Sequence, residues 1–288
     1  MASLFSFSPT TALLDLEHLT QTTLTRLSNV ALDLGLTRFP AHQYTFLTAL
    51  FFFLAVHQAF APVVSGWMSS SFRKLDRRGK NNWSIHVVSQ VHVLVVVPMA
   101  LRILNSPSQG QDRAFGWDEG AGSLQAIASA YFVWDTFDAI INFTDVGFIV
   151  HGFACSLIYL LSFRPFLSYY ASRCLLWESS TFFLNIHWFL DKTNRTGSTF
   201  QLVNGILLLA TFFFVRLIGG AYVSYQFFFT LYDAWDEIPL AYALIYGTGN
   251  IVLQGLNVFW FMKMITALRK RFSGGDGKRN GKLDAKEE

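Results

Sequence analysis

One histidine lies inside an apolar stretch of the sequence. His151 stands in TDVGFIVHGFACSL, residues 144–157, and a glycine follows it directly. An imidazole takes up and releases protons near neutral pH, so it could act as general base on a hydroxyl or amine that attacks an acyl thioester. Two acidic residues in other apolar stretches, Asp135 and Glu178, could orient such a base. His151 and Asp135 are therefore the candidate catalytic residues.

Other polar residues recur in the apolar stretches at helical spacing. Side chains three or four positions apart share one face of a helix, so each stretch presents its polar residues as a stripe. Stripes from five or six helices predict a ring of helices around a polar-lined centre. The predicted lining residues of that centre are Asp138, Glu178, Asn185, Asn204, Arg216, Asn250 and Gln254.

Three kinds of function could use such a centre, and the residues alone leave all three open. The first is acyl transfer to a lipid, with His151 as base. The second is binding of a lipid headgroup or acyl chain without catalysis. The third is a structural or trafficking protein whose stripes are interhelical hydrogen bonds, each contributing about 0.6 kcal/mol. Placing an ionisable group within a membrane costs free energy. This cost favours a functional role for His151, Asp135, Glu178 and Arg216.

The composition indicates an integral membrane protein. Hydrophobic residues make up 52% of the 288 and charged residues only 14%, whereas soluble domains contain about 25% charged residues. The net charge of +3 is small, and no nucleic-acid partner is predicted. The sequence has neither a CxxC nor an HExxH motif, so no metal site or other cofactor is predicted.

Seven stretches within residues 43–270 reach the length of about 20 residues that spans a membrane as a helix. The fold class is therefore all-α, with seven transmembrane helices. The predicted spans are 44–68, 83–104, 123–143, 146–163, 174–190, 200–223 and 241–268.

The placement of lysine and arginine predicts the orientation, because these residues are enriched on the cytosolic side. With seven spans, the basic loop after the first span, the turn with Lys192 and Arg195, and the basic C-terminal tail share one face. That face is predicted to be cytosolic, and the N-terminus lumenal. Residues 1–42 carry leucines near helical spacing and form a lumenal amphipathic segment. Residues 271–288 are Gly-rich and charged and predict a disordered, basic, cytosolic tail.

Several stretches together resemble the TLC-domain family, which includes ceramide synthases and TRAM proteins. They are YFVWDTFDAI, TDVGFIVHG, LLWESSTFFLNIHWFLDKT, LVNGILLLATFFFVRL and LNVFWFMKM. The resemblance covers about residues 80–270 and is nearest to the small eukaryotic members outside the ceramide synthases. It implies a helix barrel around a central cavity, a multi-pass protein of the endoplasmic reticulum membrane, a role in lipid homeostasis, and a membrane lipid as ligand. A homodimer is a further candidate assembly.

The resemblance also gives the opening histidine a context. Ceramide synthases carry two consecutive histidines on this helix, and these are thought to serve acyl transfer from acyl-CoA to a long-chain amine. Here the pair is His151–Gly152. A lipid-binding protein of the family is therefore the preferred interpretation. An acyltransferase that takes acyl-CoA as substrate comes second. Gly152 leaves room beside His151 for a ligand or for a neighbouring helix.

Overall fold

The computed structural model describes residues 9–143 and 145–284, with side chains described for 17–143 and 145–270. Within these residues it is helical throughout, with no strand. The elements are α1 (Pro9–Asp33), α2 (Phe39–Ala55), η1 (Val56–Phe60), α3 (Ala61–Met68), α4 (Ser70–Arg73), α5 (Arg77–Ile103), α6 (Pro107–Gln111), α7 (Glu119–Ile141), α8 (Val146–Leu161), α9 (Ser168–Cys174), η2 (Leu175–Glu178), α10 (Ser179–Lys192), α11 (Thr199–Thr211), η3 (Phe212–Gly219), α12 (Gly220–Asp233), η4 (Trp235–Glu237) and α13 (Leu240–Asp284).

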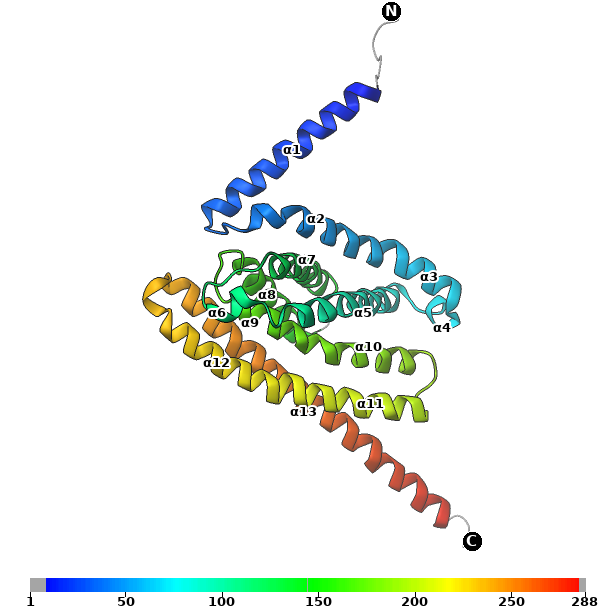
Figure 1. Ribbon diagram of the computed structural model, residues 1–288. Coiled ribbons are helices and arrows are strands. Elements are labelled where there is room, and N and C mark those ends of the chain that lie inside the picture. Colours follow the sequence, from blue (N-terminus) through cyan, green and yellow to red (C-terminus); the bar gives the residue numbers. More distant parts are fainter. Residues whose placement is uncertain (1–8, 144, 285–288) are drawn as a thin grey trace, which may run out of the picture.

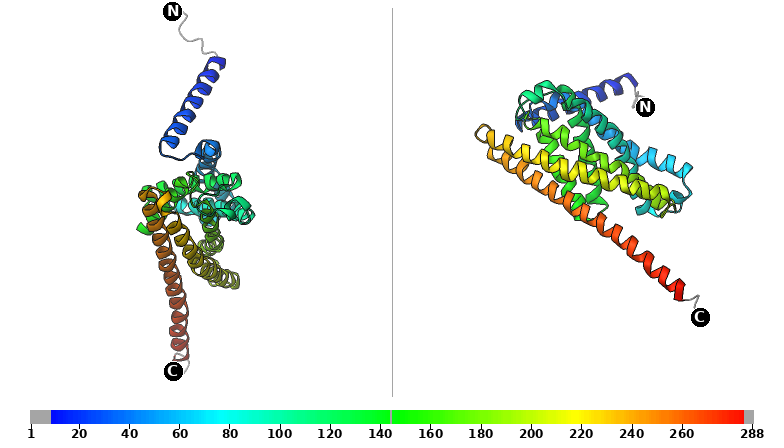
Figure 2. Two further views of the ribbon diagram at one scale, coloured as in Figure 1. Left: turned by 60° about the vertical axis from the view of Figure 1, so that its left-hand side comes forward. Right: turned by 60° about the horizontal axis from the view of Figure 1, so that its bottom comes forward.

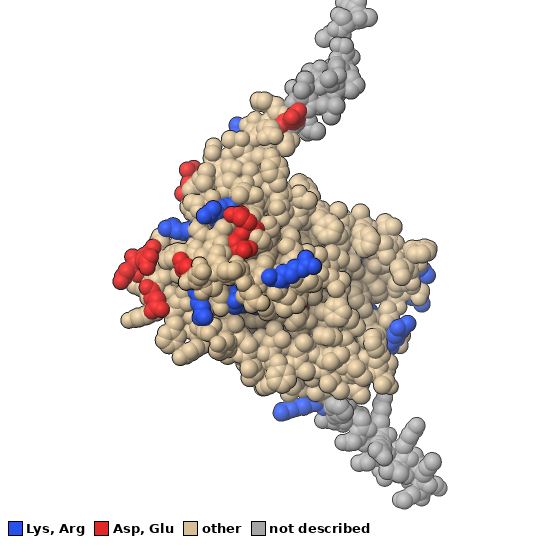
Figure 3. All heavy atoms as spheres, in the orientation of Figure 1, with Lys and Arg blue, Asp and Glu red and all other residues tan. Residues whose placement is uncertain are grey.

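Four helices among the described residues are long and apolar enough to cross a membrane. They are Phe39–Met68, Arg77–Ile103, Thr199–Asp233 and Leu240–Lys270, and α8 is a shorter apolar helix. Charged side chains are sparse over most of the face drawn in Figure 3 and gather mainly toward its two ends. The chain is therefore a multi-pass membrane protein. The remaining predicted spans correspond to α7, α8 and the α9–η2–α10 segment, and the seven-span count stays a prediction.

Helix α7 is the most enclosed of the long helices. It packs against α2, α5 and α8, and α1 and the end of α13 project from the bundle around it (Figures 1 and 2). Much of its sequence is small, as in EGAGSLQAIASA, and Leu124, Ala126, Ala128 and Ala130 are fully buried. Small side chains let membrane helices approach closely. α7 is also less apolar than its neighbours α2 and α8, which fits a helix enclosed by other helices.

Three of the long helical segments change their winding partway. η1 and η3 are π-helical, and η2 is a short 3-10 helix between α9 and α10. A π-helical turn inserts a residue and rotates the side chains that follow, and such turns are frequent at functional sites. η2 ends at Glu178 and η3 contains Arg216. The irregular turns therefore set the direction of two ionisable side chains that the sequence singled out.

The connection before α2 fixes the N-terminal segment to the bundle. Gly35 has φ 77°, a left-handed conformation suited to glycine. The backbone N–H of Arg38 then donates to the Phe163 carbonyl at 2.9 Å, and Phe39 packs on the Phe163 ring. Residues 1–8 lie outside the described residues. The predicted position of residues 1–42 on the lumenal membrane surface stays a prediction.

At the other end of the chain, α13 continues as helix to Asp284. The predicted disorder of the 271–288 tail is not tested by this, because the side chains from residue 271 onward and the whole of 285–288 lie outside the described set.

Gly152 is a point of close approach between α7 and α8. A Cβ atom built at Gly152 would lie 2.6 Å from the Thr136 hydroxyl oxygen and 3.2 Å from the Thr136 Cα. The second distance involves backbone, which cannot give way as a flexible side chain can. Of the two uses predicted for Gly152, close helix packing is therefore the one that the structure shows.

This contact predicts the effect of a methyl group. Gly152→Ala should lower the free energy of unfolding by about 1–3 kcal/mol, the usual cost of overpacking. Gly255→Ala on α13 is the matched control, because a Cβ there meets nothing within 4 Å. The control should be neutral or slightly stabilising, since alanine favours helix over glycine. Equilibrium unfolding in detergent measures both, and equal stability of the two variants would contradict the packing argument.

Candidate functional site

A cavity of about 570 Å³ opens from one end of the bundle, and we call it the outer cavity. Exposed Arg78 and Lys263 lie at its rim, and His151, Glu178 and Arg216 lie at its inner end. Between them the wall is largely apolar, with Phe132, Leu184, Leu208, Phe212 and Trp260. The cavity thus has a polar rim, apolar sides and a polar inner end.

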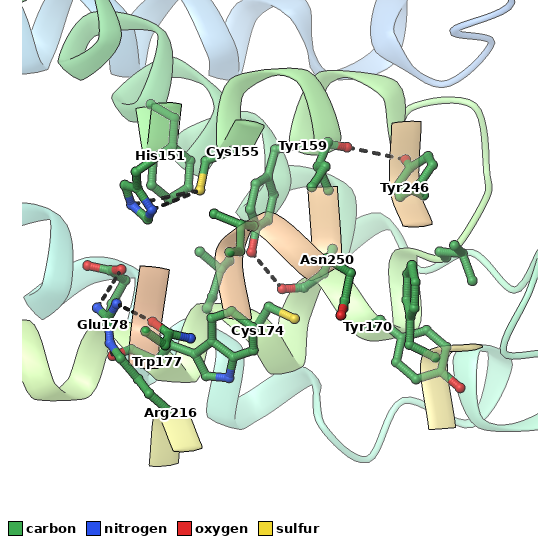
Figure 4. A pocket seen from close by; sticks show the side chains of 18 residues that line it. His151, Cys155, Tyr159, Tyr170, Cys174, Trp177, Glu178, Arg216, Tyr246 and Asn250 are labelled. Atoms are coloured by element: carbon green, nitrogen blue, oxygen red, sulfur yellow. Dashed lines mark hydrogen bonds and ion pairs between the residues drawn. The ribbon is translucent and has the colours of Figure 1, made fainter. Parts of the chain in front are cut away.

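A second, smaller cavity of about 60 Å³ adjoins the outer one, and we call it the inner chamber. The two share Phe132, His151, Glu178 and Arg216. Figure 4 shows the chamber between His151 and Glu178 on one side and Tyr170 and Tyr246 on the other, with Cys155, Tyr159, Cys174 and Asn250 around it. The shared residues therefore form a partition between two spaces.

An ion pair between Arg216 and Glu178 stands at this partition. The Arg216 Nη2 lies 3.2 Å from the Glu178 Oε1, and only 7% and 10% of the two side chains are exposed. Every other polar contact of the guanidinium is also with the protein. Its acceptors are the Trp177 carbonyl at 2.9 Å, the Ser180 hydroxyl at 2.9 Å, the Thr181 hydroxyl at 3.0 Å and the Asn257 Oδ1 at 3.3 Å. A planar guanidinium suits such multiple bonding, which a lysine could not replace.

His151 lines both cavities but has no acidic partner among the residues that the structure describes. Its ring lies edge-on to Trp260 and Phe132, with centroids 5.3 and 6.0 Å away. The Cys155 sulfur lies 3.8 Å from both ring nitrogens, so this contact does not distinguish Nδ1 from Nε2 as the hydrogen-bonding atom. Among the described residues no carboxylate oxygen lies within 4.0 Å of the ring nitrogens. The structure therefore does not bring together the expected pairing of His151 with Asp135 or Glu178.

The two aspartates of α7 differ in their surroundings. Asp138 Oδ1 accepts hydrogen bonds from the side-chain amides of Asn142 at 3.0 Å and Asn81 at 3.3 Å, and lies 3.8 Å from His57 Nε2. Asp135 also lines the outer cavity, but no described group donates a hydrogen bond to it. Asp138 is thus held in place, while the Asp135 carboxylate is free to meet a ligand.

His57 is a buried neighbour of the cavity residue Asp138 that sequence reasoning missed. It lies in the π-helical turn η1, is buried, and contacts Gln58 through Nδ1 at 2.8 Å. The signal that selected His151, a histidine within an apolar run, applies equally to AVHQAF of the first span. Its closeness to Asp138 could not be read from the sequence, since it depends on the packing of η1 beside α7.

The remaining predicted lining residues divide into two groups. Asn185 lines the outer cavity and bonds His86 and Ser89 at 2.9 and 3.1 Å. Asn250 lines the inner chamber. Asn204 and Gln254 lie on neither wall, because their amides donate at 2.9 Å to the Phe183 carbonyl and the Ser224 hydroxyl of neighbouring helices. Those two are interhelical contacts, as the structural alternative expected.

The rim includes the turn between α7 and α8. Arg78 Nη2 donates to the Phe143 carbonyl at 2.7 Å, and Lys263 Nζ lies 3.1 Å from Asp145 Oδ2. The backbone N–H of Gly147, together with the Lys263 ammonium, lowers the pKa of Asp145. A cation from α5 and a cation from α13 therefore hold this turn at the rim.

The sequence matches the TLC domain over residues 82–266, well over half of the chain. It is 38% identical over 242 residues to an uncharacterized TLC domain-containing protein of Schizosaccharomyces pombe, with 83% of each chain covered. The chain belongs to the TLC-domain family. It is 31% identical over 233 residues to Topoisomerase I damage affected protein 4 of Saccharomyces cerevisiae, covering 77% of this chain and 83% of the relative. It is 30% identical over 253 residues to human TLC domain-containing protein 4, covering 83% and 94%.

The structure of this TLC-domain protein explains why a second histidine does not fit after His151. Gly152 is buried and faces Thr136 of α7, whereas His151 faces the cavities. A histidine at position 152 would have to displace α7. Among the described residues no group of three or more His, Cys, Asp or Glu side chains could hold a metal ion.

The buried ion pair predicts a non-additive response to mutation. Arg216→Met should cost about 3–5 kcal/mol of unfolding free energy, because it leaves Glu178 buried and unpaired. The double variant Arg216→Met with Glu178→Met should recover part of that loss. Arg102→Met, an exposed arginine on α5, is the control and should change stability by less than about 0.5 kcal/mol. Unfolding in detergent measures these variants and the single Glu178→Met, and a double variant as unstable as the sum of Arg216→Met and Glu178→Met would argue against the pair.

Proposed function

We propose that this TLC-domain protein binds a membrane lipid or acyl chain in the outer cavity and acts in lipid homeostasis. The observation that carries the proposal is a cavity with apolar sides and polar ends inside a membrane protein. Its volume of about 570 Å³ falls within the roughly 300–1,000 Å³ of ligand pockets. An amphiphile matches this arrangement, since its chain contacts the apolar sides and its polar group meets an end.

The proposed setting is the endoplasmic reticulum membrane, with seven spans, a lumenal N-terminus and a cytosolic C-terminus. The positive-inside tendency supports this orientation. The right-hand end of the face in Figure 3 displays Lys and Arg without Asp or Glu, whereas at the left-hand end Asp and Glu stand among Lys and Arg. The rim of the outer cavity, with Arg78 and Lys263, would then lie on the cytosolic side.

Protease protection tests the topology. Protease added outside sealed microsomes should remove an epitope placed after Glu288 and spare one placed before Met1. Detergent is the control, because it should expose both epitopes. Cleavage of both in intact microsomes would contradict an odd number of spans.

Filling the cavity tests lipid binding. Ala139 lies on the cavity wall, whereas the next residue of α7, Ile140, is exposed on the outside of the bundle. We expect Ala139→Phe to reduce co-purifying lipid several-fold, because the ring occupies cavity volume. Ile140→Phe should leave the lipid unchanged. Mass spectrometry of extracts from equal amounts of folded protein gives the comparison, and equal lipid in both variants would oppose a central site.

Acyl transfer is the second candidate, and the position of His151 favours it. The imidazole faces both cavities, so it could meet a substrate from either side. In this alternative Asp135 contributes a free carboxylate, and acyl-CoA is a substrate. The lack of an orienting acid and the glycine at position 152 place this candidate behind lipid binding.

A direct assay separates the two candidates. Purified protein is incubated with oleoyl-CoA and sphinganine, and the N-acyl product is measured by mass spectrometry. We expect no product from the wild type or from His151→Ala, with lipid still bound to the wild type. Product from the wild type that disappears in His151→Ala, at an unchanged melting temperature, would instead establish the enzyme.

A further inference from the structure

Asn257 of α13 carries a buried donor with no acceptor. The side chain is only 1% exposed. Arg216 Nη1 donates to its Oδ1 at 3.3 Å. A guanidinium has donors only, so the amide oxygen must face Arg216 and the NH₂ group must point elsewhere. Among the described residues nothing accepts a hydrogen bond from that NH₂.

An unmet donor at this depth calls for an explanation, because buried polar groups in proteins are nearly always hydrogen-bonded. The position of Asn257 supplies one. It lines the inner chamber together with His151, Glu178 and Arg216. The chamber therefore presents a donor next to the partition through which it adjoins the outer cavity.

The chamber also limits what could meet this donor. Its volume of about 60 Å³ has room for only a few water molecules, since one needs about 10–15 Å³ of such space. Ile158, Leu167 and Leu253 make part of its wall apolar. The Tyr159 and Tyr246 hydroxyls already donate to the carbonyls of Ala171 and Ile158. A small acceptor joined to an apolar chain fits this space.

We propose that the inner chamber receives the carbonyl group of an acyl lipid, whose oxygen accepts a hydrogen bond from Asn257 Nδ2. This rests on the proposed lipid binding and names the polar group that is bound deepest. A carbonyl accepts without bringing a proton that needs its own acceptor. A phosphate would bring charge to a place where Arg216 is already paired with Glu178. Asn257 is thus a binding residue, and the outer cavity holds the rest of the molecule.

A pair of amide-to-acid substitutions tests the proposal. Asn257→Asp keeps an oxygen toward Arg216 and replaces the NH₂ with an acceptor. Gln254→Glu is the matched control, because Gln254 lies one turn earlier on α13 and contacts Ser224 rather than a cavity. The probes are methyl oleate and 9-octadecene, which have similar chains but differ in the carbonyl. Binding to delipidated protein is titrated by native mass spectrometry.

The expected result is a preference that depends on Asn257. The wild type and Gln254→Glu should bind methyl oleate about three- to tenfold more tightly than 9-octadecene, the range of one net hydrogen bond. Asn257→Asp should lose this preference while it still binds the hydrocarbon. An unchanged preference in Asn257→Asp overturns the carbonyl site. In that case only water would accept the hydrogen bond of Asn257 Nδ2. Failure of the wild type to bind either probe overturns lipid binding itself.

Infrared spectroscopy tests the same contact without any variant, so a poorly folded Asn257→Asp does not decide the matter. Methyl [1-¹³C]oleate bound to the wild type should show its ester carbonyl band at lower frequency than in empty micelles. A band at the micelle frequency, with the probe bound, overturns the proposal.

Discussion

The buried pair of Arg216 and Glu178 is the interaction on which the site depends. Two opposite charges within a helix bundle are tolerated only when each is paired and hydrogen-bonded. The 3-10 turn η2 ends at Glu178, and the π-helical turn η3 carries Arg216 to meet it. Regular α-helix through both segments would rotate these side chains. The pair thus coincides with two departures from regular α-helix, and its residues lie in the wall that the two cavities share.

The small residues of α7 are the second constraint. They allow α2, α5 and α8 to pack closely around one helix, and that helix then presents Asp135 and Asp138 to the outer cavity. The apolar sides of the cavity come from bulkier residues of the surrounding helices, such as Leu184, Leu208 and Trp260. Close packing around α7 and large side chains on the surrounding helices together leave an internal space within the size range of ligand pockets.

Much of the helix arrangement could be predicted from the sequence, because long apolar stretches report helices directly. The polar stripe containing Glu178 and Asn185 also lies on the cavity wall, as helical spacing predicts. Periodicity could not separate Gln254 from Asn250 on α13, since neighbouring helices decide which of them meets a cavity and which meets Ser224. It could not show which neighbour Gly152 meets. The π-helical turn at His57 has no periodic signature at all, and its contact with Asp138 depends on tertiary packing.

The exposed contacts of the α7–α8 turn at the rim differ from the buried contacts of the site in their sensitivity to salt. Lys263 and Asp145 form an exposed ion pair, and Arg78 holds the Phe143 carbonyl from the other side. Salt screens exposed charges far more than buried ones. On the proposed lipid binding, high salt should weaken these rim contacts and shorten the residence time of a bound molecule, while groups deep in the bundle would set the equilibrium affinity. On that proposal, exchange rate and binding strength would depend on different residues.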